Sequence, residues 1–244
     1  MPAERFFVEG AHEIGDVVEL LGGDARKVAV VLRKRSGDSI VLGDSTGRVF
    51  AASLAVEGQR VRARLDALVD AVPPPSLAIT LAQGITKGHK MDFVVEKATE
   101  IGVARIVPFA SERTVGEGDR GGKVERWRRL ARSASQQCGR SEIPVVEPPL
   151  AWPALVARMR EFDRALVPWE VAERVPLRER LGPLVEGAKS VLVVIGPEGG
   201  LSHAEVRAAE AQGAVPISLG DRILRTETAG LVACAALLYA SGSL

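Results

Sequence analysis

Residues suited to bind a ligand and to move a proton gather near the end of this 244-residue chain. Two glycine-bearing loops, 195–200 (IGPEGG) and 219–229 (LGDRILRTETA), each follow a strand-like run. Glycine has no side chain, so the main chain of such a loop can approach a ligand closely. The first loop carries Glu198, and the second carries Arg225 and Glu227, groups that can accept a proton or stabilise a developing negative charge. The two loops therefore predict a ligand site with charged groups beside it.

Each loop is set between a strand-like run and a helix. Residues 189–195 are apolar and β-branched without alternation, which is typical of a strand buried on both faces of a parallel sheet. Residues 202–205 (SHAE) match the capping box that begins a helix, and Gly213 is a suitable stop. After the second loop, Thr226 is the predicted cap of helix 227–240. This helix is so apolar that it must be buried, in its own fold or against another subunit.

The chain divides into a strand-rich part and an alternating part. Residues 1–72 hold short strand candidates with tight turns and one predicted helix, 24–32, capped by Asp24, so we expect a compact β-barrel. The segment 72–76 (VPPPS) breaks any regular element and marks a domain boundary. Strands and helices alternate through residues 73–244, which predicts a parallel α/β sheet.

The two loops and several upstream segments together resemble a known family. They are similar to the motifs of the bacterial 16S ribosomal RNA uridine-N3 methyltransferases, members of the SPOUT superfamily. The resemblance covers the chain from about residue 77 to its end, and motifs in one order are far more specific than a glycine-rich turn alone. In chain order the segments are QGITKGHKM (83–91), EKATEIG (96–102), SER (111–113), QCGR (137–140), GPEGG (196–200) and LGDRILRTETA (219–229).

This resemblance implies a fold, a reaction and partners. It implies a PUA-like RNA-binding barrel over residues 1–72 and a SPOUT α/β methyltransferase domain over 73–244, whose C-terminal loops thread a deep trefoil knot. It also implies a homodimer that methylates N3 of a uridine in 16S ribosomal RNA within the small ribosomal subunit, with S-adenosylmethionine as the cofactor. Neither DNA nor a membrane is an expected partner.

The cofactor is expected to lie among the glycine loops and the end of the preceding strand. Glycines let the main chain approach it, apolar side chains wall an adenine pocket, and by resemblance residues 167–168 supply a third wall. The alternative is that the glycines only make tight strand-to-helix turns. The expected cofactor-binding residues are Val167, Pro168, Ile195, Gly196, Gly199, Gly200, Leu219, Gly220, Ile223, Leu224 and Thr226.

The implied reaction sets a task for the charged residues of the loops. Neutral N3 of uracil has no available lone pair, so its proton must leave before or as the methyl group arrives. The expected catalytic residues are Glu227, which could accept that proton, and Arg225, which could stabilise the anion. Glu198 is an alternative base, and the pattern equally allows Glu227 to be a charge favoured in the first turn of a helix and Arg225 to be part of an ion pair.

The RNA contacts must be local, because a net charge of +1 shows none of the strong positive charge that a basic nucleic-acid-binding protein carries. Charged positions around the family motifs are the candidates for phosphate contacts. His89 stands between two of these lysines, where contact with a phosphate is more natural than proton abstraction. The expected RNA-binding residues are Arg5, Arg33, Lys87, Lys90, Arg113 and Arg140.

The remaining composition is that of an ordinary globular protein, with 46% hydrophobic and 26% charged residues. The apolar run within residues 229–240 is too short to span a bilayer, and we expect a cytoplasmic protein. Cys138 and Cys234 lack the spacing of metal ligands, so no metal site is expected and both are predicted to be buried free thiols.

Two other functions are compatible with the motifs. One is a related methyltransferase that modifies a ribose 2′-hydroxyl or another base, against which the RILRTETA form of the last motif argues. The other is a non-catalytic RNA-binding or ribosome-assembly protein. Two complete glycine loops argue against the latter, because RNA binding alone does not require a cofactor pocket.

Overall fold

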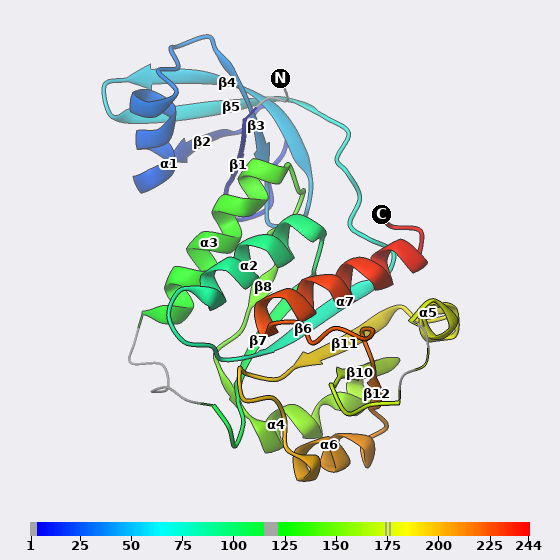
Figure 1. Ribbon diagram of the computed structural model, residues 1–244. Coiled ribbons are helices and arrows are strands. Elements are labelled where there is room, and N and C mark those ends of the chain that lie inside the picture. Colours follow the sequence, from blue (N-terminus) through cyan, green and yellow to red (C-terminus); the bar gives the residue numbers. More distant parts are fainter. Residues whose placement is uncertain (1–3, 115–121, 174, 176) are drawn as a thin grey trace. The chain divides into compact units, whose positions relative to one another are not determined.

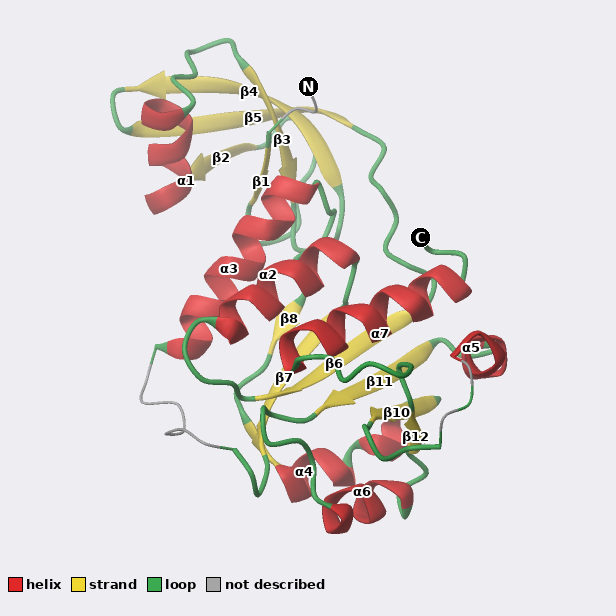
Figure 2. Ribbon diagram, in the orientation of Figure 1, coloured by secondary structure: helices red, strands yellow, loops and turns green. Residues whose placement is uncertain are grey.

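The computed structural model describes residues 4–114, 122–173, 175 and 177–244 (Figures 1 and 2). The chain forms two compact units. The first comprises residues 1–74 together with 135–142, and the second comprises 75–134 together with 143–244.

A curled five-stranded sheet forms the first unit. The strand order is β1-β3-β4-β5-β2, in which β1 and β3 are parallel and the other pairs are antiparallel. Alternate residues of the strands point inward, so Phe6, Ile40, Phe50 and Leu65 form an apolar core. The elements are β1 (Arg5–Phe7), β2 (Val17–Leu20), α1 (Gly22–Arg26), the π-helical turn η1 (Lys27–Val31), β3 (Ser39–Gly43), β4 (Val49–Glu57) and β5 (Arg60–Leu68).

The helix predicted for this unit begins earlier than expected, and its second half is a π-helical turn in place of an α-helix. The α-helical part starts at Gly22, and Leu21 occupies the N-cap position. Asp24 lies in the first turn and is not the cap; its carboxylate accepts a hydrogen bond from Gln136 Nε2 at 2.9 Å. The side chain that was expected to cap the helix is therefore used in a tertiary contact.

The second unit is a parallel α/β sheet, as predicted. All of its strand pairs are parallel, in the order β12-β10-β11-β6-β7-β8, and β9 also pairs with β7. Its elements are β6 (Ala78–Gly84), α2 (Lys90–Ile101), β7 (Arg105–Ala110), α3 (Lys123–Cys138, of which the last four residues belong to the first unit), β8 (Val145–Val146), β9 (Leu150–Ala151), α4 (Trp152–Ala157), the 3₁₀ turn η2 (Met159–Glu161), β10 (Arg164–Pro168), α5 (Leu177–Val185), β11 (Ser190–Ile195), α6 (His203–Glu210), β12 (Val215–Ile217) and α7 (Thr226–Ala240).

Helices cover both faces of this sheet, as Figures 1 and 2 show. Helices α2, α3, α5 and α7 pack on one face through a core that includes Leu81, Val95 and Leu237. Helices α4 and α6 pack on the other face, where Trp152 and Val206 meet residues of β7 and β11. Burial on both faces explains why the strand sequences are continuously apolar.

Helix α7 lies tightly against the middle of the sheet. A Cβ atom at Gly230 would meet Gln83 Oε1 at 3.2 Å and Leu81 Cδ1 at 3.3 Å, so a larger residue here would require these side chains to shift by a few tenths of an ångström. Thr226 is the first residue of the helix and Arg225 is the N-cap, which corrects the prediction of a Thr226 cap. The close packing fixes the first turn of α7 relative to the ends of β6 and β11.

The two cysteines differ in exposure, contrary to the expectation that both are buried. Cys138 ends α3 and is exposed, whereas Cys234 is fully buried in α7, where burial raises the pKa of its thiol to about 12. We expect one thiol per native chain to react with Ellman's reagent, and the second to react at least about a hundredfold more slowly until the protein is unfolded. Two fast thiols in the native protein would contradict this arrangement of α7.

The described part of the chain contains neither a membrane-spanning helix nor a cluster of metal ligands. No helix in it is both long enough and apolar enough to cross a bilayer. The same residues contain no group of three or more His, Cys, Asp or Glu side chains that could hold a metal ion.

Candidate functional site

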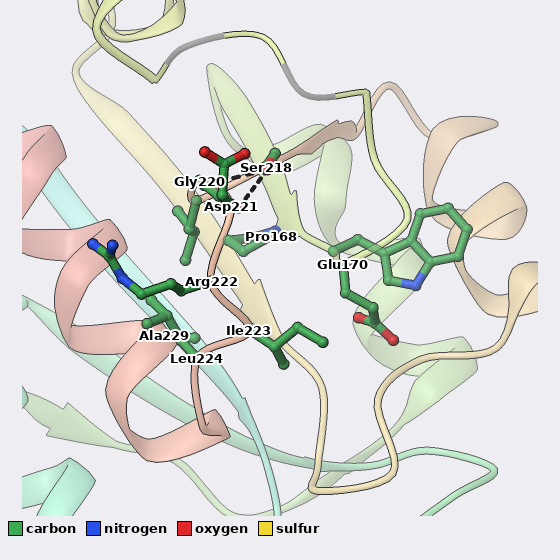
Figure 3. A pocket seen from close by; sticks show the side chains of 11 residues that line it. Pro168, Glu170, Ser218, Gly220, Asp221, Arg222, Ile223, Leu224 and Ala229 are labelled. Carbon is green, nitrogen blue, oxygen red and sulfur yellow. Dashed lines mark hydrogen bonds between the residues drawn. The ribbon is translucent and has the colours of Figure 1, made fainter.

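A pocket lies where strands β10 and β12 end. The two strands are parallel, so their carboxyl ends meet at one edge of the sheet, the edge at which open α/β sheets usually bind ligands. The cavity has a volume of about 100 Å³ and opens to solvent. The residues that line it are Pro168, Trp169, Glu170, Ser218, Leu219, Gly220, Asp221, Arg222, Ile223, Leu224 and Ala229 (Figure 3).

The pocket combines apolar walls with hydrogen-bonding groups. The Ile223 side chain is 86% exposed, and Figure 3 shows it opposite Glu170. An apolar side chain this exposed gains free energy when a ligand covers it. Trp169 Nε1 is buried without a hydrogen-bond partner among the described residues, so the indole can donate to a bound group.

The backbone of the second glycine loop is held by its own side chains. Ser218 Oγ accepts from the backbone N–H of Gly220 at 3.2 Å and lies 3.3 Å from its carbonyl oxygen. Gly220 has a φ of +114°, in the region that favours glycine. The Ser218 hydroxyl thus contacts both main-chain polar groups of Gly220 and fixes this turn of the loop.

The first glycine loop is fastened to the start of α7 by a chain of hydrogen bonds. Thr226 Oγ1 donates to the carbonyl oxygen of Gly196 at 2.5 Å and accepts from Gln83 Nε2 at 2.8 Å. A Cβ atom at Gly84 would lie 2.4 Å from Pro197 N, so the end of β6 touches the backbone of this loop. These contacts fix the loop 195–200 against both β6 and α7.

A lysine lies between two carboxylates beside this loop. Lys90 Nζ is 3.1 Å from Glu198 Oε1 and 4.0 Å from Glu227 Oε2. Glu227 Oε2 is buried and has no hydrogen-bond partner among the described residues. A carboxylate oxygen in this condition has the capacity to accept a proton or a hydrogen bond from a ligand.

The second carboxylate is less suited to take a proton. Glu198 Oε1 accepts from the backbone N–H of Lys87 at 3.1 Å as well as from Lys90. Burial raises the pKa of the Glu198 carboxyl, but hydrogen bonds from backbone N–H groups and from Lys90 outweigh it, so the pKa lies below its ordinary value. Glu198 therefore stays ionised and is a weaker base than an ordinary glutamate.

The loop that follows β7 is attached to the same edge of the sheet. The Glu205 carboxylate completes the predicted capping box of α6 with Ser202 and also accepts from the backbone N–H of Glu112 at 2.8 Å. Arg113 donates to the carbonyl oxygen of Gly199 at 3.1 Å. The first contact joins this loop to α6, and the second joins it to the loop 195–200.

Five of the residues expected to bind the cofactor line the pocket, namely Pro168, Leu219, Gly220, Ile223 and Leu224. Val167 and Ile195 are buried in the cores on the two faces of the sheet instead. The other expected residues lie in the adjoining loop or at the start of α7: Gly196, Gly199, Gly200 and Thr226.

Sequence reasoning missed several lining residues. Trp169 and Glu170 directly follow Pro168 at the end of β10. Their position after a predicted strand end was the signal that could have identified them as lining residues. Glu170 also approaches the first glycine loop, since a Cβ atom at Gly200 would lie 3.1 Å from its Oε1. The other missed lining residues are Ser218, Asp221, Arg222 and Ala229.

The residues expected to bind RNA fall in both units. In the first unit Arg5 donates to the Gly139 carbonyl oxygen, burial lowers the pKa of the Arg140 guanidinium, and Arg33 is exposed. In the second unit Lys87 and Arg113 are exposed, whereas Lys90 is the lysine between the two carboxylates. Arg225 is exposed at the N-terminus of α7.

A family model described as RNA methyltransferase domain matches residues 73–238. The chain belongs to this family. It is 30% identical to ribosomal RNA small subunit methyltransferase E of Bacillus subtilis over 97% of this chain and 96% of that protein. The identity to the protein of the same name from Mycobacterium tuberculosis is 35%, over 97% and 92% of the two chains.

Solved structures show the same α/β fold. A ribosomal RNA small subunit methyltransferase E from Neisseria gonorrhoeae, bound to S-adenosylmethionine, is 32% identical over 96% of both chains with a TM-score of 0.86. A methyltransferase from Legionella pneumophila, in complex with the same cofactor, is 32% identical over 98% of both chains with a TM-score of 0.89.

Proposed function

We propose that this protein uses S-adenosylmethionine to methylate N3 of uridine 1498 in the 16S ribosomal RNA of the small ribosomal subunit. The observation that carries the proposal is the pocket at the ends of β10 and β12 together with Glu227, three residues after the lining residue Leu224, whose buried Oε2 has no hydrogen-bond partner among the described residues. Relatives at 30–35% identity along almost the whole chain bear the name of a small-subunit ribosomal RNA methyltransferase, which supports the substrate.

The pocket suits S-adenosylmethionine in its chemistry. Leu219, Ile223 and Leu224 offer apolar surface for an adenine ring. The Trp169 indole N–H is a hydrogen-bond donor. When bound, the cofactor supplies an electrophilic methyl group on a sulfonium ion.

The residues of α2 and α7 supply the proton transfer. We assign the base to Glu227: its carboxylate takes the N3 proton, and the electron pair of the broken N–H bond forms the new bond to the methyl carbon. The electrons of the carbon–sulfur bond stay on the sulfur. Lys90, between Glu198 and Glu227, places a positive charge where negative charge develops on the uracil. Arg225, two residues before Glu227 in the chain, can stabilise the same anion from the solvent side.

We assign residues 1–72 to a PUA-like RNA-binding domain and residues 73–244 to a SPOUT domain with a trefoil knot. The path of the chain supports the knot, because after the edge strand β12 it returns to place α7 over β6 and β11 and joins Thr226 to Gly196. The target base must be unpaired or flipped, since N3 lies on the Watson–Crick edge. The residues expected to contact the RNA remain Arg5, Arg33, Lys87, Lys90, Arg113 and Arg140.

The proposed homodimer would form on the outer face of α7. Val232 is 38% exposed and Tyr239 is 74% exposed, whereas Leu238 is buried in its own chain. We expect the double substitution Val232→Glu and Tyr239→Glu to halve the mass measured by light scattering, because charges would replace apolar contact surface. Val145 on β8, an apolar side chain that is 49% exposed, provides a control as Val145→Glu. A double variant with the mass of the wild type would remove this interface.

The direct test of the proposed activity is transfer of labelled methyl from S-adenosylmethionine to undermethylated small ribosomal subunits and to naked 16S RNA. Label in the RNA of the subunits supports the proposal. Absence of transfer to both RNAs from a protein that binds no cofactor would favour a non-catalytic RNA-binding protein.

A further inference from the structure

A second cleft lies beside the loop that joins β6 to α2. It is formed within the second unit by this loop, the first turns of α2 and the start of α3. None of the residues that line it takes part in the pocket at β10 and β12. The lining residues are Ile85, Thr86, Lys87, Gly88, His89, Met91, Asp92, Lys123, Arg126 and Trp127.

Positive charge dominates the lining of this cleft. Lys87, Lys123 and Arg126 are cationic, and Asp92 is the one carboxylate among the described residues of the lining. Asp92 is 18% exposed and accepts from Arg126 NH2 at 2.5 Å, with His89 Nδ1 at 3.1 Å. The carboxylate therefore holds the guanidinium in place, while the described lining residues together carry more positive than negative charge.

A buried hydroxyl group in the lining lacks a partner. Thr86 is only 8% exposed, and its Oγ1 is buried with no hydrogen-bond partner among the described residues. A buried polar group without a partner costs free energy in the unbound protein. An anion in the cleft would satisfy this donor, so the hydroxyl points to a ligand with acceptor oxygens.

The cleft and the proposed methyl-transfer site share one short segment of chain. The backbone N–H of Lys87 donates to Glu198, and Lys90 lies between Glu198 and Glu227. Met91, the next residue, lines the cleft. A polynucleotide whose target base enters the first site would therefore have an adjoining part of its backbone beside the second.

We infer that this cleft binds a backbone phosphate of a nucleotide flanking the target uridine, with Thr86 Oγ1 and the Lys87 ammonium as direct donors and Arg126, held by Asp92, as the supporting charge. This assignment rests on the proposed function. Phosphate oxygens are acceptors only and carry negative charge, which matches a lining of cations and one unsatisfied hydroxyl.

The test uses the full-length protein, a fluorescein-labelled nine-nucleotide single-stranded RNA with a central uridine, and undermethylated small subunits. Thr86→Val keeps the shape of the side chain, so its thermal stability should equal or exceed that of the wild type. We expect it to weaken binding of the oligonucleotide about five- to tenfold, since it loses a hydrogen bond to a charged group. The affinity for S-adenosylmethionine should stay within about twofold of the wild type in the same variant.

Lys87→Gln tests the charge of the cleft. We expect it to lower the magnitude of the slope of log K against log salt concentration by about 0.7, the value for one phosphate contact on a single strand. For methylation of subunits, KM should rise about three- to tenfold while kcat changes less than about twofold. The matched control is Lys189→Gln. Lys189 is exposed and directly precedes β11, at the amino end of this strand and away from the carboxyl ends that carry the proposed site, so the substitution should leave all of these values unchanged.

The outcomes separate the two proposals. The phosphate site alone would be overturned by one pattern of results. In it, the wild-type protein methylates RNA, but Thr86→Val and Lys87→Gln show the same RNA affinity, salt slope and KM as the control Lys189→Gln. Wild-type protein that binds the oligonucleotide through Thr86 and Lys87 but methylates no RNA would overturn the proposed function and keep the phosphate site.

Discussion

Glu227→Gln is expected to lower kcat for methyl transfer about 10²- to 10⁴-fold, the range that loss of a general base produces. Glutamine preserves the size of the side chain and a carbonyl oxygen but cannot take the N3 proton. The buried Glu227 oxygen has no hydrogen-bond partner among the described residues, so folding should tolerate the change. Single-turnover rates, measured beside the Kd for S-adenosylmethionine, separate lost chemistry from lost binding.

Two further observations sharpen this prediction. Raising the pH should restore the rate of Glu227→Gln more than that of the wild type, because solvent then removes the N3 proton without a base. Glu198→Gln is the comparison, and it should reduce kcat less, since the pKa of Glu198 is held below its ordinary value. A larger loss in Glu198→Gln than in Glu227→Gln would reverse the assignment of the base.

Gly84→Ala is expected to weaken binding of S-adenosylmethionine by at least about tenfold and to lower the free energy of unfolding by about 1–3 kcal/mol, the cost of overpacking. The added Cβ atom would lie 2.4 Å from Pro197 N and 2.8 Å from Gly196 C. Both contacts are with backbone, so the loop 195–200 must move, and the hydrogen bond from Thr226 to Gly196 with it.

Gly182→Ala provides the matched control for this backbone contact. Gly182 lies in α5, and a Cβ atom there meets nothing within 4 Å. Alanine should raise the free energy of unfolding by about 0.4–1 kcal/mol and leave cofactor affinity unchanged. Calorimetric binding and chemical denaturation measure both quantities, and a Gly84→Ala protein with wild-type affinity would show that the loop does not shape the cofactor site.

Local patterns predicted the elements of the second unit well. The apolar run before the first glycine loop is strand β11, and the capping box of Ser202 and Glu205 is present with both of its hydrogen bonds. These features depend on neighbours in the sequence. The Thr226 cap was wrong because the hydroxyl is used in contacts with Gln83 and Gly196, which are far away in the chain.

The arrangement of the site could be predicted only in part, because it too depends on contacts between residues that are distant in the sequence. The glycine loops follow their strands, and Leu219, Gly220 and Ile223 line the pocket as expected. No local pattern could place the ammonium of Lys90 between Glu198 and Glu227, because parallel strands distant in sequence bring these residues together. Lys90 is therefore part of the proposed catalytic group as well as a candidate phosphate contact.

Short strands and helices were also difficult to predict. Strands β8 and β9 have two residues each, too few for a periodic signal, and α5 contains both a glycine and Pro183. Each of these elements is stabilised by tertiary packing in place of local propensity.

The most direct measurement is nucleoside mass spectrometry of 16S RNA recovered from undermethylated small subunits after incubation with the protein and S-adenosylmethionine. We expect N3-methyluridine to appear with the wild-type protein and to be nearly absent with Glu227→Gln at equal cofactor occupancy. A methyl group found on a ribose or on another base would contradict the proposed reaction.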